Sequence, residues 1–195
     1  MEAKLNNVLA KSWEMLQEAK QGKTGSRYIT VCNFAKNYLN AYTIVLRDVE
    51  LAKHQLIFYT DQRSEKVQQI KDNPNLTAVY YDNATHIQLI LKAEATIYHQ
   101  NDIAKQHWQH SGFKGRRSYL AQQAPSSVLN EEGDGLEYLN SKKFDDDDPA
   151  GFENFGVVIL NVNYLEYLQL HREGNRRARF IAKTHSGWMG EWIVP

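Results

Sequence analysis

Two groups of cationic side chains are the residues in this sequence that could bind an anion. In the first, Arg63, Ser64 and Lys66 directly follow the strand-like run at residues 58–60 and open a predicted short helix. Backbone N–H groups and the positive end of a helix dipole favour a phosphate at such a position. An ordinary capped surface helix would have the same residues, so spacing alone leaves both interpretations open.

The second group lies around the predicted last hairpin and consists of Arg172, Arg176, Arg177 and Arg179. Arg177 and Arg179 alternate with Ala178 and Phe180, so both guanidinium groups should point to the same face of a strand. Like charges held side by side need an anion or carboxylates between them. A solvated strand edge is the simpler interpretation of the same residues.

Other catalytic signatures are absent from the sequence. It contains no glycine-rich phosphate loop after a strand, no Gly-x-Ser-x-Gly elbow and no His-Glu-x-x-His motif. His107 and His110 are spaced to share a helix face, but no third ligand is apparent, so we expect no metal site. The single cysteine, Cys32, lies among aromatic and β-branched residues, which favours a buried structural thiol over a nucleophile.

Length and composition limit the classes of protein that remain. The chain has 195 residues, with 23 basic residues balanced by 23 acidic ones. This length predicts one domain, and the neutral balance argues against nucleic acid as the main partner. A single cysteine is typical of a reducing compartment. Residues 1–21 lack the apolar run of a signal peptide, and the longest aliphatic run, residues 157–160, is far short of the ~20 residues that span a bilayer. We therefore expect a cytoplasmic protein without membrane contact.

The elements that must position the candidate residues are strands with inserted helices. Residues 1–22 predict an amphipathic helix, a short helix begins after Ser64, and residues 102–123 are helix-friendly with a break near Ser111-Gly112. Strand-like runs rich in β-branched and aromatic residues cover 27–34, 41–49, 54–60, 76–81, 86–99, 155–162, 164–170, 177–183 and 192–195. This pattern predicts a mainly β protein of the α+β type, built as an antiparallel barrel with helical additions.

Residues 124–152 are predicted to form a long loop. They include Pro125, Gly133 and Pro149 and few large apolar side chains. Long ordered loops are uncommon unless they are functional, so this segment is either flexible or covers a site. The four aspartates at 145–148 lack the ligand spacing of a calcium loop and are interpreted as a solvated stretch.

Several blocks along the chain also carry a family likeness through their order and spacing. They are Thr43 to Arg47, Phe58 to Asp61 followed by Ser64 and Lys66, Asn73-Pro74, Ala78 to Tyr81, Gln88, Phe152 to Phe155, Arg176 to Phe180, and Trp192 to Pro195. Together they resemble the pyridoxamine 5'-phosphate oxidase family over roughly residues 25–195. Members of that family bind FMN in a split β-barrel. The resemblance therefore implies a single FMN-binding split-barrel domain over residues 1–195.

The resemblance also assigns roles to individual residues. Arg47 and Lys66 would pair with the FMN phosphate, and Thr60 and Ser64 would assist them. Charge-assisted contacts to a phosphate are strong, so these residues should dominate the affinity for the cofactor.

The flavin ring would be met by a second set of residues. Tyr59 would line the flavin pocket, Gln88 would hydrogen-bond to the ring edge, and Arg179 would approach the cofactor from the last strand pair. Family members are homodimers whose flavins lie at the subunit interface, so the resemblance implies a homodimer here.

The sequence departs from the family pattern at several positions. Tyr42 and Glu65 stand where the oxidases have arginines that approach the FMN phosphate, and Arg63 is the candidate replacement for the lost charge. Asn175 and Arg177 stand where the oxidases place an arginine and a histidine against the vitamin substrate. The cofactor half of the pattern is therefore largely kept, whereas the substrate half is altered.

From this pattern we expect an FMN-dependent oxidoreductase that passes electrons between a small anionic substrate and FMN. Arg177 is the candidate catalytic residue and, together with Arg117, a candidate for substrate binding. Two alternatives stay open: a true pyridoxamine or pyridoxine 5'-phosphate oxidase, and a non-catalytic flavin-binding carrier or sensor. The expected partners are a second copy of the chain and a small molecule, without nucleic acid or membrane.

Overall fold

A computed structural model describes residues 2–22, 26–35, 37–141, 149–183 and 187–195. The described residues form a nine-stranded antiparallel sheet in the order β2-β1-β5-β6-β7-β4-β3, and β8 and β9 extend it beyond the second half of β7. The strands are β1 Tyr28–Ala35, β2 Tyr38–Val45, β3 Asp48–Glu50, β4 Gln55–Asp61, β5 Asn75–Asp82, β6 Ile87–His99, β7 Phe155–Gln169, β8 Arg176–Lys183 and β9 Gly187–Ile193. The sheet does not close within one chain, so the predicted barrel is a split one.

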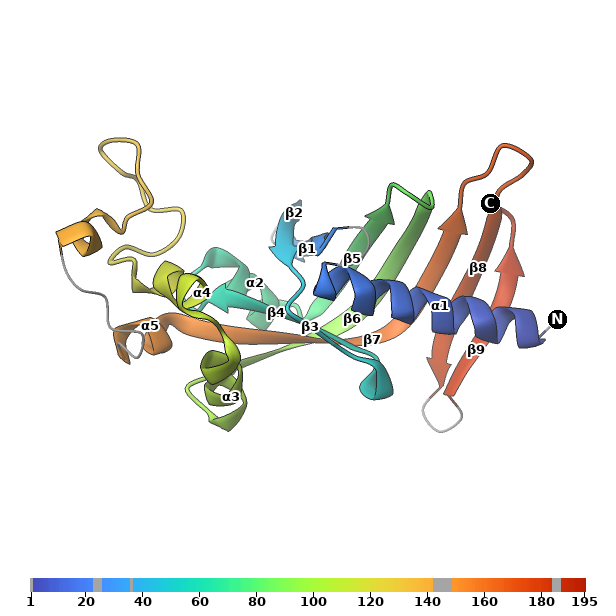
Figure 1. Cartoon of the computed structure of the whole chain (residues 1–195), viewed down its shortest axis with the longest axis horizontal. Coiled ribbons are helices and arrows are strands. Elements are labelled where there is room, and N and C mark those ends of the chain that lie inside the picture. Colours follow the sequence, from blue (N-terminus) through green and yellow to red (C-terminus); the bar gives the residue numbers. More distant parts are fainter. Residues whose placement is uncertain (1, 23–25, 36, 142–148, 184–186) are drawn as a thin grey trace.

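Strand β7 connects the two ends of the molecule. The sequence predicted two strands here, 155–162 and 164–170, but β7 is continuous from Phe155 to Gln169 because β6 pairs with it along its length. The pairing of β6 with β7 shifts its register once, between Lys92 and Ala93, and continues on both sides of this shift. On its other side, β7 pairs first with β4 and then with β8. Figure 1 shows the result: β8 and β9 lie at one end of the molecule, and β4 points toward the other.

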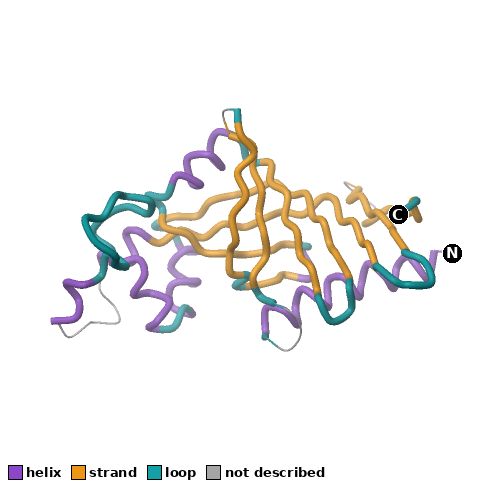
Figure 2. Tube along the Cα trace, turned by 90° about the horizontal axis from the view of Figure 1, so that it is seen from above, coloured by secondary structure: helices purple, strands orange, loops and turns teal. Residues whose placement is uncertain are grey.

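Helix α1, Glu2–Gln21, lies along one face of the sheet (Figure 2). Its apolar stripe, with Leu5, Trp13 and Leu16 buried, packs against β3 and β9 of the same chain. At its last turn, Lys20 Nζ lies 2.8 Å from Asp48 Oδ1, which ties the helix to β3. Within the described residues, no helix has both the length and the apolar character needed to cross a membrane.

The other helices are α2 Glu65–Asp72, α3 Asp102–His110, α4 Phe113–Arg117 and α5 Pro149–Asn154, with short 3₁₀ turns at Leu51–Lys53, Ser118–Leu120 and Glu137–Ser141. Of these helices, α3 packs against β6 and β7, whereas α2 packs against β1 and β6. A second, smaller core fixes α3 and α5 at the start of β7, with Trp108, Tyr119 and Phe155 in contact. The main core lies between the sheet and α1.

Two sequence-based boundaries were wrong. The predicted loop over residues 124–152 contains the helical turns at 137–141 and 149–154, because Phe152 packs against Trp108 and holds α5 in the second core. The aspartates at 145–148 lie outside the described residues. The last strand begins at Gly187 rather than at residue 192, since pairing with β8 extends it.

Candidate functional site

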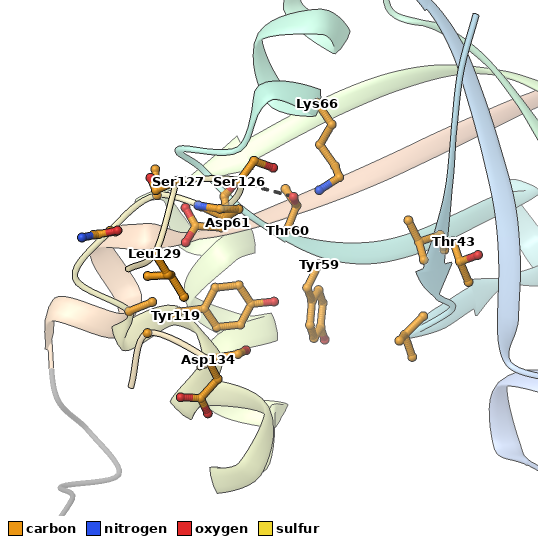
Figure 3. A pocket seen from close by; sticks show the side chains of 18 of the residues that line it. Thr43, Tyr59, Thr60, Asp61, Lys66, Tyr119, Ser126, Ser127, Leu129 and Asp134 are labelled. Atoms are coloured by element: carbon orange, nitrogen blue, oxygen red, sulfur yellow. Dashed lines mark hydrogen bonds between the residues drawn. The ribbon is translucent and has the colours of Figure 1, made fainter. Parts of the chain in front are cut away.

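A cavity of about 460 Å³ lies between the strands and the segment that follows α4. One wall comes from β2 and β4, with Thr43, Tyr59 and Thr60, and the opposite wall comes from residues 118–135 (Figure 3). This volume is in the usual range of small-molecule sites. The sequence predicted that residues 124–152 either cover a site or are flexible, and residues 124–127 do line this cavity.

Two cationic side chains of the cavity have no acidic partner among the residues that the structure describes. The Arg47 guanidinium lies over the Tyr59 ring at 5.4 Å, and Lys66 Nζ lies over the Tyr42 ring at 5.5 Å. Among the described residues, neither has a carboxylate within salt-bridge distance. Burial lowers the pKa of Lys66, although the nearby charge of Asp61 partly opposes this. An anion in the cavity would supply the counter-charge that both groups lack.

The turn between β4 and α2 places hydroxyl groups beside these cations. Thr60 Oγ1 and Ser64 Oγ are 3.1 Å apart, and both residues are buried. Ser64 occupies the N-cap position of α2 in an extended conformation, yet its side chain does not cap the helix. The hydroxyl pair and the uncapped start of α2 therefore add hydrogen-bond donors at the cavity that holds Lys66.

Arg63 has a different environment from the one that the sequence suggested. Its guanidinium binds Asp61 through Nε at 3.1 Å and Nη2 at 2.8 Å, and also donates to the carbonyls of Ala121 and Gln122. Four contacts of this kind leave little capacity for a phosphate. In the structure, Arg63 links Asp61 at the end of strand β4 to the backbone of residues 121–122 in the opposite wall of the cavity.

Aromatic side chains form the floor between the two walls. Tyr59 Oη lies 3.1 Å from His107 Nδ1, and its ring meets Phe155 edge-on with centroids 4.9 Å apart. Burial raises the pKa of Tyr59 and lowers the pKa of His107, so both groups are neutral near pH 7. His110 instead lies against the Gln106 carbonyl. In the part of the chain that the structure describes, no three metal-ligating side chains come together.

Three predicted site residues lie away from this cavity. Gln88 is on β6, and Arg177 and Arg179 are on β8, at the other end of the molecule (Figure 1). Gln88 lies opposite Leu168 of β7, which lies opposite Arg177, so they share a row across the sheet. The prediction that Arg177 and Arg179 share a face is confirmed, because Ala178 between them is buried on the other side.

Carboxylates neutralise both of these arginines. Arg177 Nη2 lies 2.6 Å from Glu166 Oε1, and Arg179 Nε lies 2.7 Å from Glu191 Oε1. The sequence left three explanations open for Arg177 and Arg179: a bound anion, carboxylates between them, or a solvated strand edge. The structure shows that carboxylates of the same chain balance both charges. Arg117, the remaining substrate candidate, is not among the residues that line the cavity, but it pairs at 3.2 Å with Asp134, which lines it.

The cavity also contains residues that the sequence did not single out. Ser126, Leu129 and Asp134 line it from the segment beyond α4. They have no motif of their own, and the only signal for them was the length of the predicted loop. Their placement depends on Arg63 and on Tyr138 Oη, which donates to the Leu120 carbonyl at 2.6 Å.

Comparison with known proteins supports the sequence resemblance. Residues 6–99 match the family model described as pyridoxamine 5'-phosphate oxidase, FMN-binding domain. This confirms the predicted family resemblance for the segment that contains Arg47, Tyr59, Thr60 and Lys66. No curated protein matches the chain by sequence.

Solved structures extend the likeness over the whole fold. An FMN-binding protein related to pyridoxamine 5'-phosphate oxidase from Nostoc punctiforme PCC 73102 has 20% identity and a TM-score of 0.76, covering 95% of this chain and 96% of that one. PhzG from Burkholderia lata 383, solved with tetrahydrophenazine-1-carboxylic acid, has 16% identity and a TM-score of 0.74, covering 97% and 92%. At these identities the likeness concerns the fold, and it confirms the predicted split barrel.

Proposed function

We propose that this protein is an oxidoreductase that uses FMN in the cavity beside Lys66, and the match of residues 6–99 to the FMN-binding domain of pyridoxamine 5'-phosphate oxidase supports this. One observation carries the proposal. Arg47 and Lys66 enter a cavity of ligand size, beside the Thr60 and Ser64 hydroxyls, and neither has an acidic partner in the described part of the chain. Because a phosphate is the anion that such a donor set binds best, the residues present fit the cofactor.

Each residue of the cavity has a distinct part in holding the cofactor. Arg47 and Lys66 neutralise the phosphate, and Thr60 and Ser64 add hydrogen bonds to it. Tyr59 provides an apolar wall for the flavin, and the segment held by Arg63 limits the access of water. FMN, when bound, supplies the hydride chemistry, so the chain needs no acid–base pair of its own for that step.

A homodimer completes the proposal. Gln88 and Arg179 cannot reach the cavity of their own chain, since they lie at the far end of β7, but a second copy can bring them to it. Support comes from the sheet face that carries them. By the strand register, this face also presents a set of exposed apolar side chains: Phe34, Leu39, Tyr81, Ile181 and Met189. An exposed apolar surface of this kind is typical of an interface.

The expectation of an anionic substrate is not part of the proposal. Arg177 and Arg117 were its candidates, and both guanidinium groups are already paired with carboxylates.

The test is the visible absorption spectrum of the purified protein after incubation with FMN and desalting. We expect flavin bands that co-elute with the protein, and their loss in an Arg47→Gln, Lys66→Gln double variant. A wild-type protein that retains no flavin would contradict the proposal. Anaerobic mixing of the flavin-loaded protein with pyridoxine and pyridoxamine phosphates and with reduced nicotinamides then tests for an enzyme, whose flavin bleaches, against a carrier or sensor, whose flavin does not.

A further inference from the structure

Glu166 is a buried carboxylate in an otherwise solvent-facing row of side chains. It lies on β7 directly opposite Arg179 of β8, and the residue is only 7% exposed. The Glu166 side chain nevertheless reaches diagonally to Arg177, and Arg179 turns to Glu191 of β9. Arg177 therefore pairs with Glu166 and Arg179 pairs with Glu191, and of these two carboxylates only Glu166 is buried.

Both oxygens of Glu166 are occupied. Oε1 accepts from Arg177 Nε at 2.9 Å and from Nη2 at 2.6 Å, and Oε2 accepts from Tyr164 Oη at 2.8 Å. The ammonium group of Lys92 lies over the ring of the same tyrosine at 4.7 Å. A carboxylate with this set of donors is held in one position. An anion that bound the Nε and Nη2 edge of Arg177 would have to displace Glu166 and leave its buried charge without a partner.

The paired state of Arg177 differs from the state of the two cationic side chains in the cavity. Arg47 and Lys66 have no acidic partner among the described residues, whereas Arg63, Arg117, Arg177 and Arg179 are all neutralised by carboxylates of the same chain. Of these six cationic groups, only Arg47 and Lys66 are open, and the FMN phosphate of the proposed function would bind there. The Arg177 guanidinium itself already has a carboxylate partner.

We propose that Glu166 is a specificity-determining residue that closes the Arg177 position to anions, so that the substrate presents an uncharged group there. The inference rests on the proposed function, because it concerns the substrate that reaches the flavin. With both Nε and Nη2 committed to Glu166, Arg177 can still donate from Nη1. This suits a neutral acceptor, such as a carbonyl oxygen or a ring nitrogen, rather than a phosphate or carboxylate.

The experiment measures the binding of pyridoxine 5'-phosphate to the FMN-saturated protein by calorimetry. We expect weak binding by the wild type that Arg177→Gln does not change. Glu166→Gln keeps the shape of the side chain and removes the charge, so it should tighten binding by about tenfold or more, as expected for one charge-assisted contact. The double variant Glu166→Gln, Arg177→Gln should lose this gain.

Glu191→Gln is the matched control, because it frees the neighbouring Arg179 in the same way and should leave the affinity unchanged. The proposal is overturned if wild-type protein binds the phosphate ester and Arg177→Gln weakens that binding by about tenfold, or if Glu166→Gln brings no gain while circular dichroism shows it folded. If the protein retains no FMN, the proposed function fails separately. If the protein retains FMN and Glu166→Gln brings no gain, only the inference about Glu166 fails.

Discussion

The guanidinium of Arg63 donates hydrogen bonds to both carboxylate oxygens of Asp61, from Nε to Oδ1 at 3.1 Å and from Nη2 to Oδ2 at 2.8 Å. The backbone N–H of Arg63 donates to Oδ1 as well, at 2.8 Å. From this fixed position the same guanidinium holds the carbonyls of Ala121 and Gln122. One ion pair therefore connects the end of strand β4 to the opposite wall of the cavity.

Replacing Arg63 with alanine should destabilise the protein. The Asp61 side chain, 8% exposed, would lose its counter-charge, and two backbone carbonyls would lose their donor. We expect a loss of about 2–3 kcal/mol in the free energy of unfolding, less than for a fully buried pair because Arg63 is partly exposed. Urea denaturation measures it. Arg117→Ala is the control, since its partner Asp134 is 59% exposed and the expected cost is about 0–1 kcal/mol. Equal effects of the two variants would refute this role of Arg63.

Replacing Lys66 with alanine should weaken FMN binding without unfolding the protein. The loss of one charge-assisted phosphate contact is expected to cost about 1.5–3 kcal/mol in binding free energy. Flavin fluorescence titration measures the dissociation constant. Lys71→Ala, in the last turn of the same helix, is the matched control and should leave the constant unchanged. An unchanged constant for Lys66→Ala would remove this residue from the phosphate site.

Stability should fall in mildly acidic solution because of His54. Its ring lies between Trp13 and Trp188, at centroid distances of 5.0 and 5.1 Å, and its Nδ1 accepts from Trp188 Nε1 at 3.3 Å. Burial lowers the pKa of His54 from 6.5, so the unfolded chain binds this proton at a higher pH than the folded protein does. His54 therefore contributes its full stability above about pH 6.5, and the contribution is lost as the pH falls through the lowered pKa.

Tryptophan fluorescence and urea denaturation between pH 4.5 and 7.5, a range of about one to two units on either side of the ordinary histidine pKa, test this prediction. His54→Asn is the suitable comparison, because the residue has φ 53° and asparagine tolerates the left-handed region. The variant should lack the part of the pH dependence that has a midpoint below about 6.5. If wild type and variant show the same dependence in this range, His54 is not its source.

Gly190 of β9 should not tolerate a side chain. A Cβ atom at this position would lie 2.6 Å from Cε1 and 2.7 Å from Cδ1 of Phe180, a buried ring with little room to shift. We expect Gly190→Ala to lower the free energy of unfolding by about 1–3 kcal/mol, the usual cost of overpacking a core. In Gly115→Ala, the control, the new Cβ meets nothing within 4 Å, and the helix should be stabilised by up to about 1 kcal/mol.

Local periodicity determined several features of this protein by itself. The apolar stripe of α1, the start of α2 after Ser64 and the shared face of Arg177 and Arg179 follow from side-chain repeats of 3.6 and 2 residues. The turn that we propose for the phosphate was also visible in the sequence, because its residues lie within seven positions, from Thr60 to Lys66.

The tertiary structure decided the continuity of β7 and the place of the segment beyond α4. The break predicted in β7 does not occur, because β6 pairs along its whole length, and strand pairing depends on distant residues more than on local propensity. Residues 118–135 have no regular pattern, so only their contacts with Arg63 and Tyr138 place them at the cavity.

Tertiary structure also decided which arginines are open to a ligand. In the sequence, Arg47 and Arg177 carry the same charge and the same chemistry. Folding brings Glu166 against Arg177, while Arg47 meets the ring of Tyr59 and no carboxylate among the described residues. Pairing of this kind is set by which strands become neighbours, and that arrangement is a property of the whole sheet rather than of any segment.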